Sequence, residues 1–219
     1  VKTFNFHLMF TTLLNFCSND LSAFYFDIRK DTIYCDSKDS NNRKSTRTLL
    51  HLIFNYLVRW FAPSLSFTTE EAWKAIGNTS SVHLEDFIST NEQYSNNHLK
   101  AKWDILKQIR RVVTGALEKK RADKIIGSSL EAHVDIFLDQ TTLNKFENIQ
   151  LDEIMITSSA SLKEIKKNLN GFTLEDVKNV EVIISKAQGR KCQRCWKYTS
   201  KLIKDEICNR CNDAISKIQ

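Results

Sequence analysis

Four of the six cysteines are paired near the end of the chain, and this spacing restricts the local fold more than any other feature. Two residues separate Cys192 from Cys195, two separate Cys208 from Cys211, and twelve lie between the pairs. Each C-x-x-C turn can direct two sulfur atoms at one point, so the two turns supply four thiolates to a tetrahedral Zn²⁺ ion. Four sulfur ligands leave no position for water, which predicts a structural metal, one zinc ion per chain. A segment this short would draw its folding free energy from the metal.

Other interpretations of the cysteines stay open. Disulfide bonds suit secreted, cysteine-rich chains, whereas this sequence shows no signal peptide. Four cysteines also suit iron–sulfur chemistry, and the spacing could be coincidental. The two remaining cysteines, Cys17 and Cys35, stand alone, and we expect them to pack without chemistry.

Residues that interrupt helices are scarce in the rest of the chain. The 219 residues include 5 glycines and a single proline, Pro63, which disfavours an all-β fold. Apolar residues recur at three- and four-residue steps over about residues 4–35, and again from about residue 43 to just before Pro63. A third stripe runs from Leu99 to Leu117, in a helix that we expect to end at Gly127. We expect a helix for each pattern.

A shorter helix is expected after Pro63. Thr68 followed by Glu71 fits a capping box, in which each residue satisfies a backbone amide of the first helical turn. The helix should run through Ile76 and end at Gly77, because glycine readily adopts the left-handed conformation that terminates helices.

Beyond Gly127 the apolar period changes. Residues 134–138 alternate, residues 152–159 resemble a short strand, and residues 180–187 are rich in β-branched side chains. Three other segments look helical: 141–148, 161–169 and 173–179, the last with Thr173 as its cap. The sequence therefore predicts a mainly α chain in three parts. These are a helical bundle over residues 1–126, a small α+β domain over 127–187 and a four-cysteine module over 188–219.

Positive charge and one tryptophan indicate a nucleic-acid partner. The formal net charge is +6, a modest excess that favours a polyanion. Trp196 directly follows the second cysteine, in a small module, and basic residues including Arg190, Lys191, Arg194 and Lys197 surround it. An unpaired base could stack on this indole while the cations hold phosphates. The alternative is that Trp196 covers the metal cluster or packs on the α+β domain.

Several classes of function lack their sequence signatures. No apolar run reaches the roughly 18 residues needed to span a bilayer, so we expect no membrane association. A glycine-rich phosphate loop, an H-E-x-x-H motif and a nucleophile elbow are absent. Carboxylate pairs such as Asp27 and Asp31 fit solvated helix faces, and no catalytic residue is predicted.

Four stretches together resemble the C-terminal region of bacterial isoleucyl-tRNA synthetases. In order they read "DLSAFYFDIRKDTIYCD", "LVRWFAPSLSFTTEEAW" with "SVHLEDF", "RRVVTGALEKKRADKIIGSSLEAHV" and "KCQRCWKYT…ICNRC". The resemblance implies an anticodon-binding bundle of the class I synthetase type, a junction domain and a zinc finger, which together hold the anticodon stem and loop of tRNA(Ile). It also implies that Trp196 meets anticodon bases. We expect further contacts, chiefly to phosphates, from six basic residues: Arg194, Lys197, Arg190, Arg110, Arg111 and Arg47.

The sequence departs from that family in one respect. The His-x-Gly-His and Lys-Met-Ser-Lys-Ser types of ATP-binding signature are absent. We therefore expect the chain to be inactive alone in aminoacylation, with ATP bound only through the missing catalytic domain. That N-terminal catalytic portion would be a second partner beside tRNA(Ile). The start at Val1 suggests a piece of a longer polypeptide, and we expect a cytoplasmic location.

Two other functions stay open. A DNA-repair glycosylase can carry a terminal zinc finger with similar C-x-x-C pairs, but it needs a catalytic N-terminal proline, whereas Pro63 lies inside the predicted bundle. A zinc-stabilised protein-interaction module without a nucleic-acid role is the other alternative.

Overall fold

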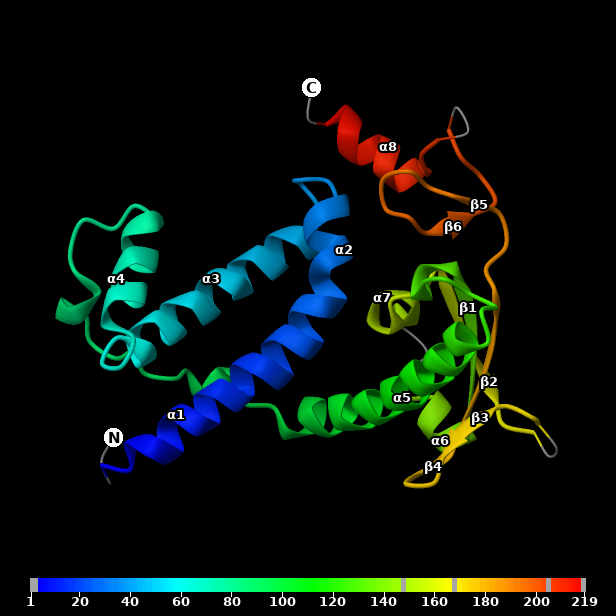
Figure 1. Cartoon of the computed structure of the whole chain (residues 1–219), viewed down its shortest axis with the longest axis horizontal. Coiled ribbons are helices and arrows are strands. Elements are labelled where there is room, and N and C mark those ends of the chain that lie inside the picture. The colour runs from blue at the N-terminus through cyan, green and yellow to red at the C-terminus, as the bar shows by residue number, and fades with distance from the viewer. Residues whose placement is uncertain (1–3, 147–148, 167–168, 204–205, 218–219) are drawn as a thin grey trace. The chain divides into compact units, whose positions relative to one another are not determined.

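The computed structural model describes residues 4–146, 149–166, 169–203 and 206–217. This part of the chain is mainly helical, with a four-stranded sheet, a two-stranded hairpin and a terminal cysteine module (Figure 1). Two compact units make up the chain, Val1–Ser95 and Asn96–Gln219. The predicted fold class is confirmed. No helix among the described residues is long and apolar enough to cross a membrane.

The regular structure described in the first unit is helical. Its elements are α1 (Phe6–Asn15), the π-helical η1 (Phe16–Phe26), α2 (Asp27–Cys35), α3 (Asn41–Phe61), α4 (Ser66–Ala75), η2 (Val82–Leu84) and η3 (Glu92–Tyr94). The helices predicted over residues 4–35 and up to Pro63 are confirmed. The hydroxyl of Ser40 caps α3 by accepting the N–H of Arg43 at 3.4 Å.

The predicted capping box of α4 is wrong. The helix begins at Ser66, so Thr68 already lies inside the first turn and cannot be the N-cap. Glu70, not Glu71, makes the bonds that tie this helix to the next segment, accepting the Val82 N–H at 2.9 Å. Gly77 follows the helix with φ +93°, as expected for a terminator.

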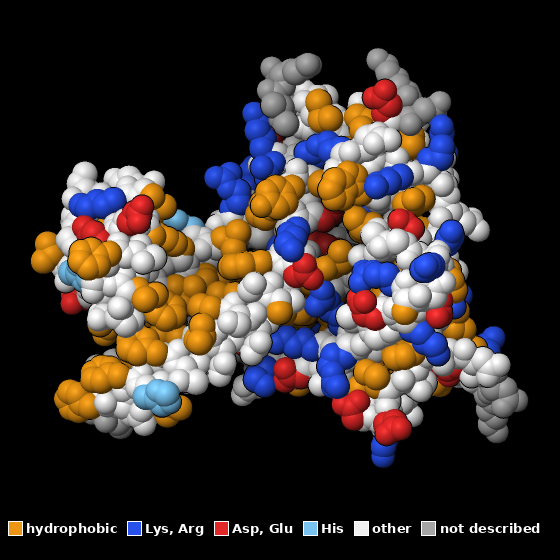
Figure 2. All heavy atoms as spheres, in the orientation of Figure 1, with side chains coloured by type: hydrophobic (Ala, Val, Ile, Leu, Met, Phe, Trp, Pro, Cys, Tyr) orange, Lys and Arg blue, Asp and Glu red, His pale blue; other side chains and the backbone are white. Residues whose placement is uncertain are grey.

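A small apolar cluster stabilises α3 and α4. Val58, Ala62, Trp73 and Val82 are buried together. The guanidinium of Arg59 lies 4.7 Å from the centre of the Trp73 ring. Many large apolar side chains of this unit remain exposed, among them Phe6, Leu8 and Leu14 on α1 and Phe67 on α4. Figure 2 shows apolar side chains on the surface of this unit.

The second unit combines one long helix with a sheet and the cysteine module. Its elements are α5 (Asn97–Ala122), η4 (Ser129–Glu131), β1 (Ala132–Leu138), α6 (Gln140–Leu143), α7 (Leu151–Met155), β2 (Ser159–Glu164), β3 (Phe172–Leu174), β4 (Val177–Lys186), β5 (Arg190–Lys191), β6 (Tyr198–Thr199) and α8 (Asn209–Ser216). The sheet order is β2-β1-β4-β3, with β1 parallel to β2 and antiparallel to β4. β5 and β6 form a separate two-stranded hairpin.

The apolar stripe of α5 forms the core of this unit. Leu106, Ile109, Val113 and Leu117 are buried as predicted and join the apolar side chains of β1 and β4 in one cluster. The expected bundle of residues 1–126 included this helix, whose buried stripe packs on the sheet. The apolar pattern correctly predicted which face of α5 is buried, but such a pattern cannot predict which other element packs against that face.

The end of α5 differs from the prediction. The helix stops at Ala122, before the expected Gly127, and Lys124 adopts the left-handed conformation with φ +56°. The N–H of Ile125 donates to the carbonyl of Lys120 at 3.0 Å, which completes a Schellman motif with lysine at the usual glycine position.

Three predictions in the α+β region are wrong. Residues 152–159 form most of α7 and only the first residue of β2, because residues 151, 154 and 155 are buried at helical spacing. The segment 161–169 continues β2 to Glu164, although its residues 167–168 lie outside those described, and 173–179 belongs to β3 and β4. Thr173 therefore caps no helix. Of the predicted helix 141–148, the structure has α6 up to Leu143, and residues 147–148 are also outside the described part.

Polar contacts across the sheet explain how the polar segment β2 forms a strand. Ser159 Oγ lies 2.7 Å from His133 Nδ1, and Lys163 Nζ lies 2.8 Å from Asp135 Oδ1. Burial opposes ionisation of Asp135, but hydrogen bonds led by the one from Lys163 outweigh it and lower the pKa of this carboxyl. These partners come from β1, so the segment's own sequence does not reveal them.

Candidate metal centre and nucleic-acid interface

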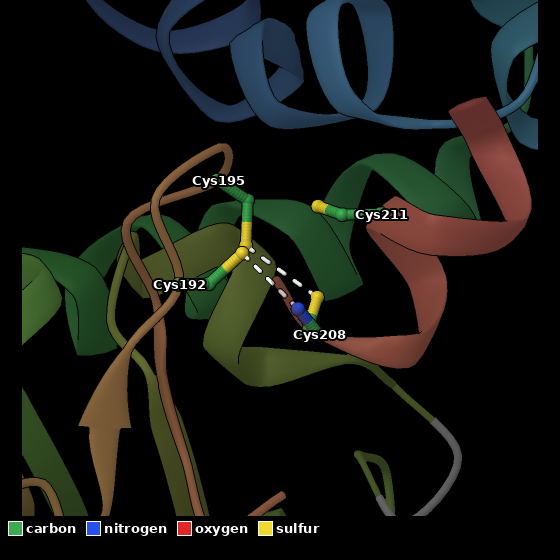
Figure 3. Close-up of side chains that lie close together, drawn as sticks. All are labelled: Cys192, Cys195, Cys208 and Cys211. Carbon is green, nitrogen blue, oxygen red and sulfur yellow. Dashed lines mark hydrogen bonds between the residues drawn. The ribbon is translucent and has the colours of Figure 1, made fainter. Parts of the chain in front are cut away.

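The structure brings the four predicted cysteine ligands together (Figure 3). Their sulfur atoms all lie within 4.8 Å of one another. Cys192 and Cys195 come from the turn between β5 and β6, Cys208 is the N-cap of α8, and Cys211 lies in the first turn of that helix. Three of the four side chains are buried and Cys208 is half-buried.

Backbone hydrogen bonds shape the two cysteine turns. The N–H of Cys192 donates to the carbonyl of Lys197, and the N–H of Trp196 donates to the carbonyl of Cys192, both at 2.9 Å. The N–H of Cys208 donates to the sulfur of Cys192 at 3.3 Å, which joins the second turn to the first (Figure 3). Gly189 starts the hairpin with φ +98°, where a Cβ would lie 2.2 Å from the carbonyl oxygen of Thr199. No larger residue fits there without a change of the hairpin.

The sulfur atoms differ in how readily they ionise. Burial opposes ionisation of Cys192, but backbone N–H groups of Cys195, Cys208 and Arg194 outweigh it and lower the pKa of this thiol to about 6. Burial raises the pKa of Cys195 and of Cys211. Four adjacent thiolates repel one another, so a cation is needed to hold them together in the ionised form.

The donor set fits a tetrahedral metal ion. None of the six cysteines, all of which the structure describes, forms a disulfide bond, and the sulfur atoms of Cys195 and Cys208 are 3.8 Å apart, well beyond the length of such a bond. A tetrahedron with metal–sulfur bonds of about 2.3 Å has sulfur–sulfur edges of about 3.8 Å. The cluster can therefore hold one metal ion with four sulfur ligands.

Trp196 differs from the cysteines beside it because the residue is 58% exposed. Its backbone is left-handed, with φ +64°, a conformation that costs a residue with a side chain about 1–2 kcal/mol. The Nζ of Lys191 lies 5.4 Å from the centre of the indole ring. Strained residues of this kind cluster at functional sites, and the exposed ring is accessible to a ligand.

The other predicted residues of the module have different surroundings. Arg190 is exposed on β5. Arg194 is half-buried and its Nη1 donates to the sulfur of Cys211 at 3.6 Å. Lys197 is only 17% exposed, and its Nζ lies 2.8 Å from Asp152 Oδ2 on α7. The side chains of Arg194 and Lys197 therefore contact groups of the protein itself.

The three remaining basic residues lie outside the module. Arg110 and Arg111 are on α5, where Arg110 Nε donates to the carbonyl of Ile154 at 2.9 Å. Arg111 forms an exposed ion pair with Asp176 at 2.9 Å. Arg47 is exposed on α3, in the first unit.

The sequence did not reveal which residues hold the module against the sheet. Asp152 accepts from Lys197, and the hydroxyl of Ser158 accepts the N–H of Tyr198 at 2.6 Å. Both residues lie about 40 positions earlier in the chain, 45 for Asp152 and 40 for Ser158. No local pattern links positions so far apart.

Comparison with known proteins bears on the identity of the chain. A family model described as "Anticodon-binding domain of tRNA ligase" matches residues 1–136. The isoleucine–tRNA ligase of Pelagibacter ubique is 45% identical over 199 residues, which cover 90% of this chain and 21% of the relative. The corresponding protein of Bartonella henselae is 44% identical over 198 residues, covering 90% of this chain and 20% of the relative. For Bradyrhizobium diazoefficiens the identity is 42% over 205 residues, 92% of this chain and 20% of the relative.

The chain thus spans about a fifth of the length of the curated relatives it matches. The matches agree with the resemblance drawn from the four sequence stretches, which is thereby confirmed.

Proposed function

The chain belongs to the anticodon-binding domain family of tRNA ligases, and from this premise we propose that it is the part of an isoleucine–tRNA ligase that binds the anticodon stem-loop of tRNA(Ile). ATP-dependent aminoacylation would take place in a catalytic portion of the ligase, with which this chain works in the cytoplasm. The proposal rests chiefly on the observation that Trp196, which directly follows the cluster residue Cys195, has an exposed indole.

We propose zinc as the metal of the cluster. Four cysteine ligands leave no open coordination position, so the ion has a structural role. Cys192, Cys195, Cys208 and Cys211 would hold it and thereby join the β5–β6 turn to α8. The ion neutralises the thiolates. The module then presents Trp196 without a large apolar core.

Trp196 would stack on an unpaired anticodon base. An unpaired base could stack on the exposed indole, while Lys191, whose Nζ lies over the ring, and Arg190 supply positive charge for the neighbouring phosphates. Arg111 and Arg47 are also exposed and would contact backbone phosphates, which adds salt dependence but no base preference.

Contacts of Arg110, Arg194 and Lys197 with RNA stay predictions. The side chains of these residues are half-buried and have partners within the protein, so we expect them to contribute less to RNA binding than the exposed residues do. We retain the functional division into 1–126, 127–187 and 188–219 as part of the proposal.

A binding experiment tests the proposal. The metal-loaded chain is titrated with the anticodon stem-loop of tRNA(Ile) and with a version whose anticodon bases are exchanged, at several salt concentrations. We expect tighter binding to the native loop and a loss of about 1–3 kcal/mol on Trp196→Ala for the native loop. Equal, salt-insensitive weak binding of both RNAs would refute an anticodon-binding role.

A further inference from the structure

The two residues that follow Trp196 leave the metal turn and contact the sheet part of the same unit. Lys197 Nζ lies 2.8 Å from Asp152 Oδ2, with side chains that are 17% and 37% exposed. The N–H of Tyr198 donates to the hydroxyl of Ser158, which in turn donates to the carbonyl of Leu130. The chain is thus attached at consecutive residues, once through a side chain and once through its backbone.

Lys197 also belongs to the metal turn, because its carbonyl accepts the N–H of Cys192 at 2.9 Å. One residue therefore connects the first cysteine to α7. Trp196 lies between this residue and the ligand Cys195. Its backbone is thus held on both sides, which fixes the direction in which its Cβ leaves the chain.

We propose that Lys197, Tyr198, Asp152 and Ser158 form a latch that positions Trp196 for its RNA target. The inference rests on the proposed function and gives Lys197 a role other than phosphate contact. If only the covalent chain joined the cysteine module to the sheet, the module could move relative to the sheet, and fixing its position on RNA binding would cost conformational entropy. The latch removes this cost beforehand, and preorganisation of this kind is a general source of affinity.

Because Lys197 is charged, the direction in which RNA affinity changes on Asp152→Asn tests the proposal. Asp152→Asn removes the carboxylate that Lys197 Nζ contacts and makes the protein more positive by one charge. If Lys197 served mainly as a phosphate ligand, this change would strengthen RNA binding. If Lys197 acts through the latch, the same change weakens binding, because Trp196 is no longer held. The two roles predict opposite effects of one substitution.

The binding experiment compares metal-loaded wild type, Asp152→Asn, Ser158→Ala and the exchanged pair Lys197→Asp with Asp152→Lys. Asp104→Asn is the matched control, since it removes an equivalent carboxylate from the exposed Lys100–Asp104 pair at the start of α5. We expect Asp152→Asn to bind the tRNA(Ile) stem-loop roughly three- to tenfold more weakly. The exchanged pair should recover part of the RNA affinity that Asp152→Asn loses. The control Asp104→Asn should not bind RNA more weakly than the wild type.

A double-mutant cycle shows whether the latch acts through the indole. In a Trp196→Ala background the effect of Asp152→Asn should largely disappear, because there is no ring left to position. Tighter binding by Asp152→Asn, or the same loss with and without the indole, would overturn the proposal.

A readout without RNA separates the latch from the proposed function. With 5-fluorotryptophan incorporated, the ¹⁹F resonance of Trp196, assigned from Trp196→Phe, should shift or broaden in Asp152→Asn and in Ser158→Ala while metal content stays unchanged. An unaltered resonance in both variants would refute the latch. Failure of the wild type to bind the stem-loop would refute the proposed function, and the ¹⁹F measurement would still decide on the latch.

Discussion

Replacing Trp196 by glycine and, separately, by alanine distinguishes the cost of its backbone conformation from the value of its indole. Both variants lose the ring, including its contact with Lys191 at 5.4 Å. They differ in the left-handed backbone with φ +64°, which only glycine adopts without strain. We expect the glycine variant to be the more stable of the two by about 1 kcal/mol. This order is opposite to that inside helices and strands, where glycine is less stable than alanine by roughly 0.5–1 kcal/mol.

The stability of the module is best followed through the metal cluster. Cobalt bound by four thiolates gives an absorption signal that disappears when the cluster opens, so denaturant titrations of the cobalt-loaded variants report on this module alone. RNA binding is measured in parallel, and both variants should lose the same 1–3 kcal/mol or so that stacking supplies. Equal or greater stability of the alanine variant would refute the strain argument. Undiminished RNA affinity in a folded glycine variant would refute the stacking role.

Three further predictions concern the second unit. Gly115→Ala should destabilise it by about 1–3 kcal/mol in urea, because a Cβ would lie 2.8 Å from the Phe172 ring; a gain, as at an ordinary helical position, would contradict the close packing. Asp139 caps α6 and its hydrogen bonds from Thr141 and Thr142 hold its pKa at about 2, below the usual 3.8. The ionised cap therefore stabilises the folded protein fully above pH 3.8, and this contribution is lost as the pH falls toward 2. Asp139→Ala should cost about 1 kcal/mol near pH 7 and less near pH 2, and a difference independent of pH would count against this role. Cys208→Ser should lose the metal, and hydrogen exchange should then show α8 unprotected while the sheet core stays protected; a metal-free module that stays ordered would contradict the metal's structural role.

Local sequence patterns correctly predicted the elements that are determined by residues close together in the chain. The spacing of the cysteines predicted a cluster that the structure assembles within 4.8 Å. The stripe of α5 predicted its buried face, and the β-branched residues 180–187 predicted most of β4. Each of these predictions rests on residues close together in the sequence: the spacing of metal ligands, the helical period of apolar residues, or a run of β-branched side chains.

The same reasoning failed where a distant partner determines the local structure. β2 is a strand because β1 offers backbone partners and the side chains His133 and Asp135, although the segment itself looks helical. The predicted end of α5 failed because Lys124 adopts a conformation that favours glycine. A tertiary environment can outweigh intrinsic preferences of about 1 kcal/mol per residue.

The sequence by itself determined that two cysteine pairs and a following tryptophan share one small basic module, since ligand number and spacing are properties of the chain. Only the tertiary structure decided what each neighbouring cation does. The Nζ of Lys191 lies over the indole ring, Arg194 donates to the sulfur of Cys211, and Lys197 pairs with Asp152. The physical reason is that a lysine or arginine can contact any acceptor within reach of its long side chain. Which acceptor is within reach depends on segments far away in the sequence.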